Sequence, residues 1–132
     1  MKLKEFSSYD VGKFGEKQCA KYLKKTKKFK IFGKNVTIGH LEADIIAYDK
    51  SHIIIVEVKT RREDKNTISR PASAVNYDKR TNLIKFAYAF CKSLPSKLKN
   101  KNIRIDVCEV TCAADKKLKL CTINYIENAV SR

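Results

Sequence analysis

The chain has 132 residues, of which 43% are hydrophobic, and its 29 Lys and Arg against 14 Asp and Glu give a formal net charge of +15. This length predicts one domain spanning residues 1–132, with enough apolar residues for a packed core, which excludes a disordered basic tail. No apolar run approaches the roughly 18 residues of a membrane span. The charge favours a polyanionic partner, either a nucleic acid or an anionic membrane surface.

Two features of the sequence indicate the cellular compartment. Residues Met1–Phe6 lack the apolar stretch of a secretory signal, and the five cysteines are an odd number without a CxxC pair. Both favour reduced thiols in the cytoplasm over a disulfide framework or a zinc site. Cys108 and Cys112 share one face of an expected strand, and we interpret them as core thiols, with a metal site as the weaker alternative.

Apolar side chains at helical spacing predict a first helix over about 9–25, capped by Ser8 or Asp10. The segments after it alternate apolar and polar residues and predict strands. In chain order these are Phe29–Ile31 and Val36–Ile38, as two strands or one bent strand, then Leu41–Tyr48 and Ile53–Thr60, joined by the connection Asp49–His52.

The second half predicts a mobile loop over Thr60–Pro71, a helix over Ser73–Leu94 ended by Pro95, and strands over Ile103–Cys112 and Leu118–Ile126. Each helix has only one apolar side and must cover a sheet. The order α-β-β-β-α-β-β therefore predicts an α/β fold, a mixed β-sheet flanked by α-helices.

Charged side chains interrupt the apolar faces of the two central strands. Glu57 and Lys59 share one face of their strand, and Glu42 and Asp44 share one face of the strand before it. A four-residue loop between the strands places Asp44 opposite Glu57, whereas a two-residue turn would shift this register.

Two opposed carboxylates repel each other unless a positive charge lies between them. A divalent cation that prefers oxygen ligands, Mg²⁺ or Mn²⁺, fits that position. Lys59, one pleat beyond Glu57, would then hold a scissile phosphate or orient the attacking water. The alternative is a surface ion pair of Glu57 with Lys59, worth less than about 1 kcal/mol.

Asp44 followed by Glu57-Val58-Lys59 on the next strand resembles the PD-(D/E)XK nuclease superfamily, with its restriction-endonuclease-like core. Ordered matches over most of the chain resemble the YraN-type endonuclease-like family, which is related to archaeal Holliday-junction resolvases. They comprise Gly12-x-x-Gly15-Glu16 with Ala20 and Leu23, then Asn35, Leu41–Ala47, Ile55–Arg61, Lys79, Arg104–Val107 and Ile123–Ala129. Leu41, Ala43 and Thr37 depart from the pattern, at positions that concern substrate contacts rather than metal ligands.

The resemblance implies an Mg²⁺-dependent (or Mn²⁺-dependent) endodeoxyribonuclease that hydrolyses DNA phosphodiester bonds, with branched DNA among its substrates and a homodimer as one assembly. On that basis Asp44, Glu57, Glu16 and the Val58 carbonyl ligate the metal, and Lys59 stabilises the phosphate charge or the attacking water. The main alternative is a catalytically inactive nucleic-acid-binding module. A membrane-surface or protein-interaction domain is weaker, because no basic amphipathic helix with a bulky apolar face is evident.

Further charged residues support the site. Glu16 borders the apolar stripe of the first helix, where it either faces the sheet or pairs with Lys13 in solvent. Glu42 is either a partner of the metal ligands or a charge at the strand entrance. Lys79 falls inside the apolar stripe of the second helix, where its ammonium either reaches a phosphate or extends to solvent.

Basic residues follow the strand that carries Glu57. We expect them in the loop after that strand, contacting the nucleic-acid backbone, because guanidinium groups match phosphate geometry. They are Arg61, Arg62, Lys65 and Arg70.

Overall fold

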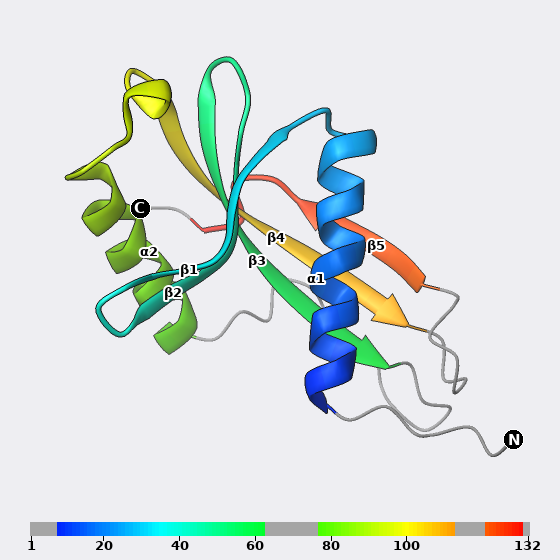
Figure 1. Ribbon diagram of the computed structural model, residues 1–132. Helices are drawn as coiled ribbons and strands as arrows, with labels where there is room; N and C mark the ends of the chain where they lie inside the picture. Colours follow the sequence, from blue (N-terminus) through cyan, green and yellow to red (C-terminus); the bar gives the residue numbers. More distant parts are fainter. Residues whose placement is uncertain (1–7, 63–76, 113–120, 131–132) are drawn as a thin grey trace, which may run out of the picture.

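The computed structural model describes residues 8–62, 77–112 and 121–130. Five strands form one sheet in the order β1-β2-β3-β4-β5, in which β3 and β4 are parallel and the other neighbours antiparallel. Figure 1 shows α1 lying across the sheet and α2 beside the β1–β2 hairpin. The elements are α1 (Ser8–Lys25), β1 (Lys30–Ile38), β2 (Leu41–Tyr48), β3 (His52–Arg62), α2 (Tyr77–Cys91), a 3₁₀ turn (Ser96–Leu98), β4 (Asn102–Cys112) and β5 (Cys121–Ile126). The predicted α/β class and element order are confirmed.

The predicted hairpin register between β2 and β3 is confirmed from Tyr48–Ile53 to Ile45–Val56, but the predicted pairing of Asp44 opposite Glu57 is not part of the ladder. Tyr48 pairs with Ile53, as a four-residue loop requires. The Asp49 carboxylate fixes this turn, since its Oδ1 accepts hydrogen bonds from the backbone N–H groups of Ser51 (2.9 Å) and His52 (2.7 Å). β1 is one strand with an irregularity between Ile31 and Gly33, so of the two alternatives the single bent strand is correct.

Two element boundaries differ from the predicted ones. β3 does not end at Thr60: Arg61 and Arg62 continue it, because β4 pairs with it up to Cys112, so the expectation that these arginines lie in a loop is wrong. α2 ends at Cys91 and not at Leu94. After Cys91, the backbone N–H groups of Lys92 and Ser93 bond to carbonyls three residues earlier, and Pro95 follows. Lys65, Arg70, the beginning of the predicted second helix and that of the last strand lie outside the described residues.

Each helix packs its apolar face on one side of the sheet. Cys19 and Leu23 of α1 belong to a core with the β3 residues Ile54 and Val56. Phe86 of α2 belongs to the opposite core, with Ile53 and Ile55 among its members. Cys108 and Cys112 are buried in the α1-side core, as expected of core thiols. Among the described helices, none is both long and apolar enough to cross a membrane.

The strand β2 rotates at Asp44. Ala43 belongs to the α2-side core and Ile45 to the α1-side core, although residues two apart on a regular strand share a face. Across from this point, Asn35 of β1 has a positive φ of 51°, a conformation that asparagine tolerates better than most residues. The β2–β3 ladder reaches only Ile45–Val56. The two strands therefore diverge at Asp44, and a fork opens between them.

Candidate active site

A cavity of about 600 Å³ lies at the fork between β2 and β3, with α1 and α2 at its sides. Its lining contains all the residues predicted for catalysis and all of those predicted for phosphate contact within the described ranges, but not Glu42, the predicted partner of the metal ligands. The lining residues are Val11, Gly12, Glu16, Asp44, Glu57, Val58, Lys59, Thr60, Arg61, Arg62 and Lys79. The fold thus gathers side chains that four separate elements contribute.

Asp44 is fixed by the backbone of β3. Its Oδ2 accepts a hydrogen bond from the Val58 N–H at 2.8 Å, so a side chain bridges the strands where their backbone ladder has ended. Burial raises the pKa of the Asp44 carboxyl, and the negative charges of Glu16 and Glu42 add to this rise. The Val58 hydrogen bond and the charge of Lys79 oppose it but do not cancel it.

Glu57 is the most buried acid of the cavity, with 3% of its surface exposed. Burial, followed by the charge of Asp44, raises the pKa of Glu57 to about 7, although Lys79 and Lys59 act in the opposite direction. The neighbouring Asp44 carboxylate thus raises the free energy of the charged form of Glu57. Such a pair gains stability from any cation that both can contact.

Lys79 contacts Glu57 directly. Its Nζ lies 2.9 Å from Glu57 Oε1, and 46% of the lysine side chain remains exposed. The hydrogen bond to Glu57 raises the pKa of Lys79. The sequence offered a phosphate contact or an extension to solvent for this lysine, and the pairing with Glu57 was not foreseen. In the sequence, the one indication of this ion pair is the position of Lys79 in the apolar stripe of the second helix.

Glu16 reaches the cavity from α1. Its Oε1 lies 3.6 Å from Lys13 Nζ and accepts a weak hydrogen bond from Asn35 Nδ2 at 3.4 Å. Glu16 therefore both lines the cavity and pairs with Lys13, the two roles that were treated as alternatives. The hydrogen bond from Asn35 also links α1 to the residue of β1 that has a positive φ.

The remaining charged residues differ in their surroundings. Lys59 lines the cavity, whereas Arg61 Nη2 lies 3.2 Å from Glu109 Oε2 on β4. Glu42 is exposed and lies outside the main cavity, in an adjoining one of about 170 Å³ that also contacts Glu57 and Lys79. Its charge acts on Asp44 at a distance.

Gly15 is a residue whose role the sequence did not reveal. A Cβ atom at this position would lie 2.7 Å from both Cβ and Cγ2 of Thr60, closer than real contacts allow. Only glycine lets α1 approach β3 this closely beside the cavity. In the sequence, the indication of this close approach is the spacing Gly12-x-x-Gly15, which is also part of the resemblance.

The donor set suits a hard cation. Among the described residues, no cluster of three or more His, Cys, Asp or Glu side chains is arranged to hold one ion. The carboxylates that the two strands offer are those of Asp44 and Glu57, and burial raises the pKa of both. Mg²⁺ is commonly held by one or two carboxylates while it keeps several waters, so the residues present fit it.

Fold and site together define a small mixed α/β protein with a carboxylate pair and lysines in one cavity at a strand fork. The chain belongs to the family described as "Uncharacterised protein family UPF0102", whose sequence model matches residues 15–110. It is 37% identical to the UPF0102 protein of Caldanaerobacter subterraneus subsp. tengcongensis over 127 residues, covering 96% of this chain and 99% of that protein. It is 40% identical to the UPF0102 protein of Thermodesulfovibrio yellowstonii over 120 residues, covering 91% and 95% respectively.

Proposed function

We propose that this protein is an Mg²⁺-dependent (or Mn²⁺-dependent) endodeoxyribonuclease. The observation that carries the proposal is the carboxylate pair of Asp44 and Glu57 at the strand fork, in one cavity with Lys59 and Lys79. Groups with pKa values shifted by burial and a specific charged neighbour concentrate at functional sites. The resemblance to YraN-type and PD-(D/E)XK proteins supports the same reading of these residues.

The chain's own residues divide the work. Asp44, positioned by the Val58 N–H, and Glu57 would hold the cation from the two strands, with the Val58 carbonyl as a further oxygen donor. Glu16 lines the same cavity but does not form a three-acid cluster with them among the described residues. When bound, the metal supplies Lewis-acid polarisation of the phosphate and lowers the pKa of a coordinated water. Lys59 contacts the phosphate oxygens or the attacking water, and stabilises the negative charge that develops there.

Lys79 has a second role in this proposal. Its ammonium partly compensates the charge of Glu57 in the metal-free protein, at a distance of 2.9 Å. With Glu57 committed to the cation, this half-exposed lysine is available to a phosphate oxygen at the cavity mouth. The substrate we propose is DNA, with branched junctions as a test case, and a homodimer remains an expectation from the resemblance.

One observation favours the alternative, an inactive nucleic-acid-binding module. The Lys79–Glu57 ion pair already supplies a positive charge to the carboxylate pair. A protein that has lost its metal could keep the fold with this contact alone. That alternative predicts salt-sensitive DNA binding without any divalent-cation dependence.

Cleavage assays decide between the two functions. Linear duplex, single-stranded, flap and four-way-junction DNA are incubated with the wild-type protein and Mg²⁺ or Mn²⁺. We expect cleavage of at least one substrate, and a loss of roughly 100-fold or more in the Lys59→Met variant. Lys85→Met, an exposed lysine of α2, is the control and should cleave as wild type does. No cleavage of any substrate, or equal cleavage by Lys59→Met, would contradict the proposal.

A further inference from the structure

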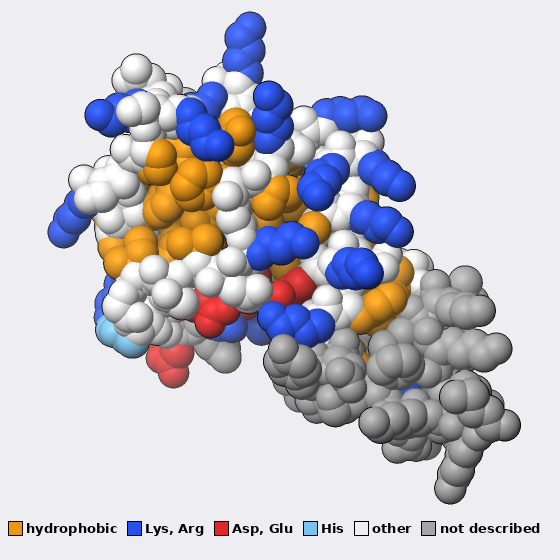
Figure 2. Space-filling model, in the orientation of Figure 1, with side chains coloured by type: hydrophobic (Ala, Val, Ile, Leu, Met, Phe, Trp, Pro, Cys, Tyr) orange, Lys and Arg blue, Asp and Glu red, His pale blue; other side chains and the backbone are white. Residues whose placement is uncertain are grey.

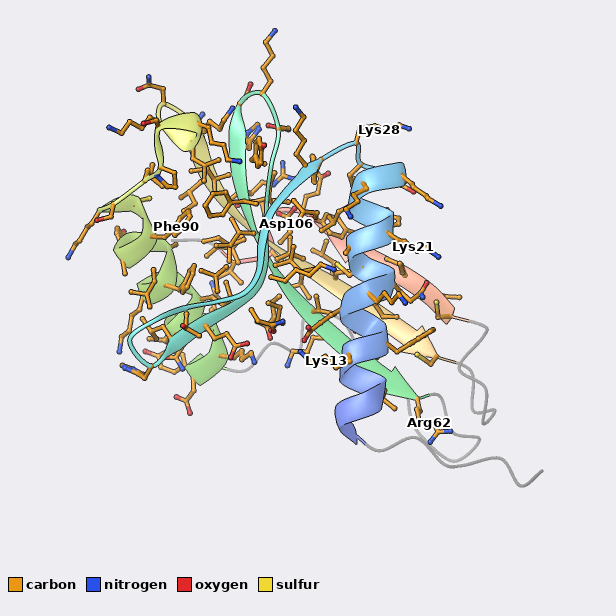
Figure 3. The ribbon with its side chains drawn as sticks, in the orientation of Figure 1. Lys13, Lys21, Lys28, Arg62, Phe90 and Asp106 are labelled. Carbon is orange, nitrogen blue, oxygen red and sulfur yellow. The ribbon has the colours of Figure 1, made fainter. Side chains whose placement is uncertain are left out.

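Lysines form a stripe along the outer face of α1. Lys13, Lys17, Lys21 and Lys24 are all exposed, and their spacing of three or four residues places them on one side of the helix. They span about 16 Å at 1.5 Å per residue. Lys28 continues the line past the end of the helix. Figure 3 shows Lys13 beside the lower part of α1, Lys21 on the right of its middle and Lys28 above its upper end.

This stripe does not stabilise the helix. Like charges four residues apart on a helix repel each other and lower its stability. Within residues 8–62, 77–112 and 121–130, neither Lys17, Lys21 nor Lys24 forms an ion pair with an acidic side chain. Lys13 has Glu16 as a partner at 3.6 Å, so within the described part of the chain the repulsion among Lys17, Lys21 and Lys24 is the part that no acidic side chain compensates. A polyanion laid along the stripe would relieve it.

Both ends of the stripe lead to cavities. At the lower end, Gly12 and Glu16 of α1 line the carboxylate cavity. At the upper end lies a second cavity of about 320 Å³, lined by Lys28, Lys30, Tyr48, Asp49, Lys50 and Lys101. Its one carboxylate is engaged by backbone N–H groups of the turn. Figure 2 shows Lys and Arg side chains spread over α1 and the upper edge of this face, with acidic side chains below them.

We propose that the lysine stripe binds the phosphate backbone of a DNA duplex that extends from the carboxylate cavity towards the upper lysine cavity. This inference rests on the proposed function for the identity of the polyanion. The stripe is about 16 Å long, the length of roughly five base pairs at 3.4 Å each. The duplex is thus held on one side of the scissile phosphate, and the footprint is asymmetric.

Two observations favour a duplex over other polyanions. Single-stranded nucleic acid is usually bound by aromatic side chains on which bases stack, but Tyr22 of α1 is half-buried and its ring packs on Tyr125 with centroids 5.5 Å apart. A membrane surface requires bulky apolar side chains beside the lysines. Among the described residues, the large apolar side chains that are exposed are Tyr77 and Tyr88, and both belong to α2.

The test uses two triple variants with the same net charge. The stripe variant is Lys17→Gln/Lys21→Gln/Lys24→Gln, and the control is Lys85→Gln/Lys92→Gln/Lys99→Gln, three exposed lysines away from α1. Binding of a labelled duplex of about 20 base pairs is measured in EDTA over a range of salt concentrations. In the stripe variant, the slope of log K against log salt should fall in magnitude by about 2 to 3, and in the control by less than about 1.

Several outcomes would overturn the inference: equal losses in both variants, unchanged binding by the stripe variant, or a larger loss for a single strand of equal length than for the duplex. Loss of binding to phosphatidylserine vesicles with retained DNA binding would also overturn it and favour a membrane surface. Gln keeps a high helix propensity, so circular dichroism should show an intact α1. Because EDTA removes divalent cations, the result is independent of cleavage. A protein that binds DNA through the stripe but never cleaves it would refute only the proposed function.

Discussion

Lys79 of α2 and Glu57 of β3 form an ion pair across the candidate active site, with Nζ and Oε1 2.9 Å apart. The glutamate is almost fully buried and the lysine is half-exposed. Even with this partner, burial and the neighbouring Asp44 keep the pKa of Glu57 near 7. The site therefore holds a carboxylate that is incompletely compensated, which is a property of the metal-free protein that stability measurements can detect.

Removal of the lysine should reveal how much Glu57 depends on it. In Lys79→Met, we expect the free energy of unfolding at pH 8 to fall by about 1–2 kcal/mol, between the values typical of exposed and buried pairs. At pH 5 the loss should be smaller, because Glu57 is then protonated and needs no counter-charge. Urea unfolding in EDTA at both pH values measures this, with Lys85→Met as the control. An equal loss at pH 5 and pH 8 would contradict the assigned pairing.

Replacement of Glu57 should change the free energy of unfolding in the opposite direction to Lys79→Met as the pH rises. The pKa of Glu57 rises from its ordinary value of 4.5 to about 7 in the folded protein, so the folded state holds its proton more tightly than the unfolded state. Its favourable contribution is present below about pH 4.5 and is lost as the pH rises through about 7. Glu57→Gln cannot lose that proton.

We therefore expect Glu57→Gln to gain stability relative to wild type between pH 5 and pH 8, by about 1–3 kcal/mol. The measurement is the free energy of unfolding of both proteins across this range in EDTA. Asp49→Asn, an acid of the β2–β3 turn, serves as a control. Parallel pH profiles of Glu57→Gln and wild type would mean that Glu57 titrates normally.

The contact of α1 with β3 offers a paired comparison on one helix. Gly15→Ala places a Cβ against Thr60 and should lower stability by about 1–3 kcal/mol, despite the better helix propensity of alanine. Gly12→Ala has no atom within 4 Å of the new Cβ and should raise stability by roughly 0.5–1 kcal/mol. Thermal unfolding of both variants tests this. Destabilisation by Gly12→Ala, or none by Gly15→Ala, would show that the helix packs differently.

A buried network on the α1 side fixes the other end of the sheet. Asp106, fully buried, accepts hydrogen bonds from Arg104 Nε and Nη2 at 2.9 Å, from Tyr125 Oη at 2.6 Å and from the Asn128 N–H at 2.8 Å. Burial, followed by the charge of Asp106, raises the pKa of Tyr125, so this phenol stays protonated as a donor. The network joins β4, β5 and the turn after β5.

Loss of the acid leaves Arg104 without its main partner, so Asp106→Ala should cost about 3–5 kcal/mol. Tyr125→Phe removes one of four hydrogen bonds and should cost about 1–2 kcal/mol. Denaturant titrations of both variants measure the two losses of stability and show which is larger. A larger loss in Tyr125→Phe than in Asp106→Ala would show that the ring packing, rather than the acid, holds this region together.

Local chemistry explains what the sequence could predict. The β2–β3 register followed from the loop length, because the Asp49 side chain closes that turn with hydrogen bonds to nearby residues. The shared face of Glu57 and Lys59 followed from strand alternation. These features depend on residues close in the chain, and the structure agrees with them.

Long-range packing explains what the sequence could not predict. The Lys79–Glu57 pair depends on how α2 crosses the sheet. The continuation of β3 through Arg62 depends on its parallel pairing with β4, which a single polar segment does not reveal. The rotation of β2 at Asp44 is set together with the left-handed Asn35 on the neighbouring strand.

In the proposed function, Asp44 and Glu57 together bind one divalent cation. Isothermal titration of the metal-free protein with Mn²⁺ at pH 8 tests it most directly, with Asp44→Asn, Glu57→Gln and the turn variant Asp49→Asn compared under the same conditions. We predict one Mn²⁺ per chain for wild type and Asp49→Asn, and loss of binding in folded Asp44→Asn and Glu57→Gln. No Mn²⁺ binding by the wild-type protein, or undiminished binding by both site variants, would contradict the account.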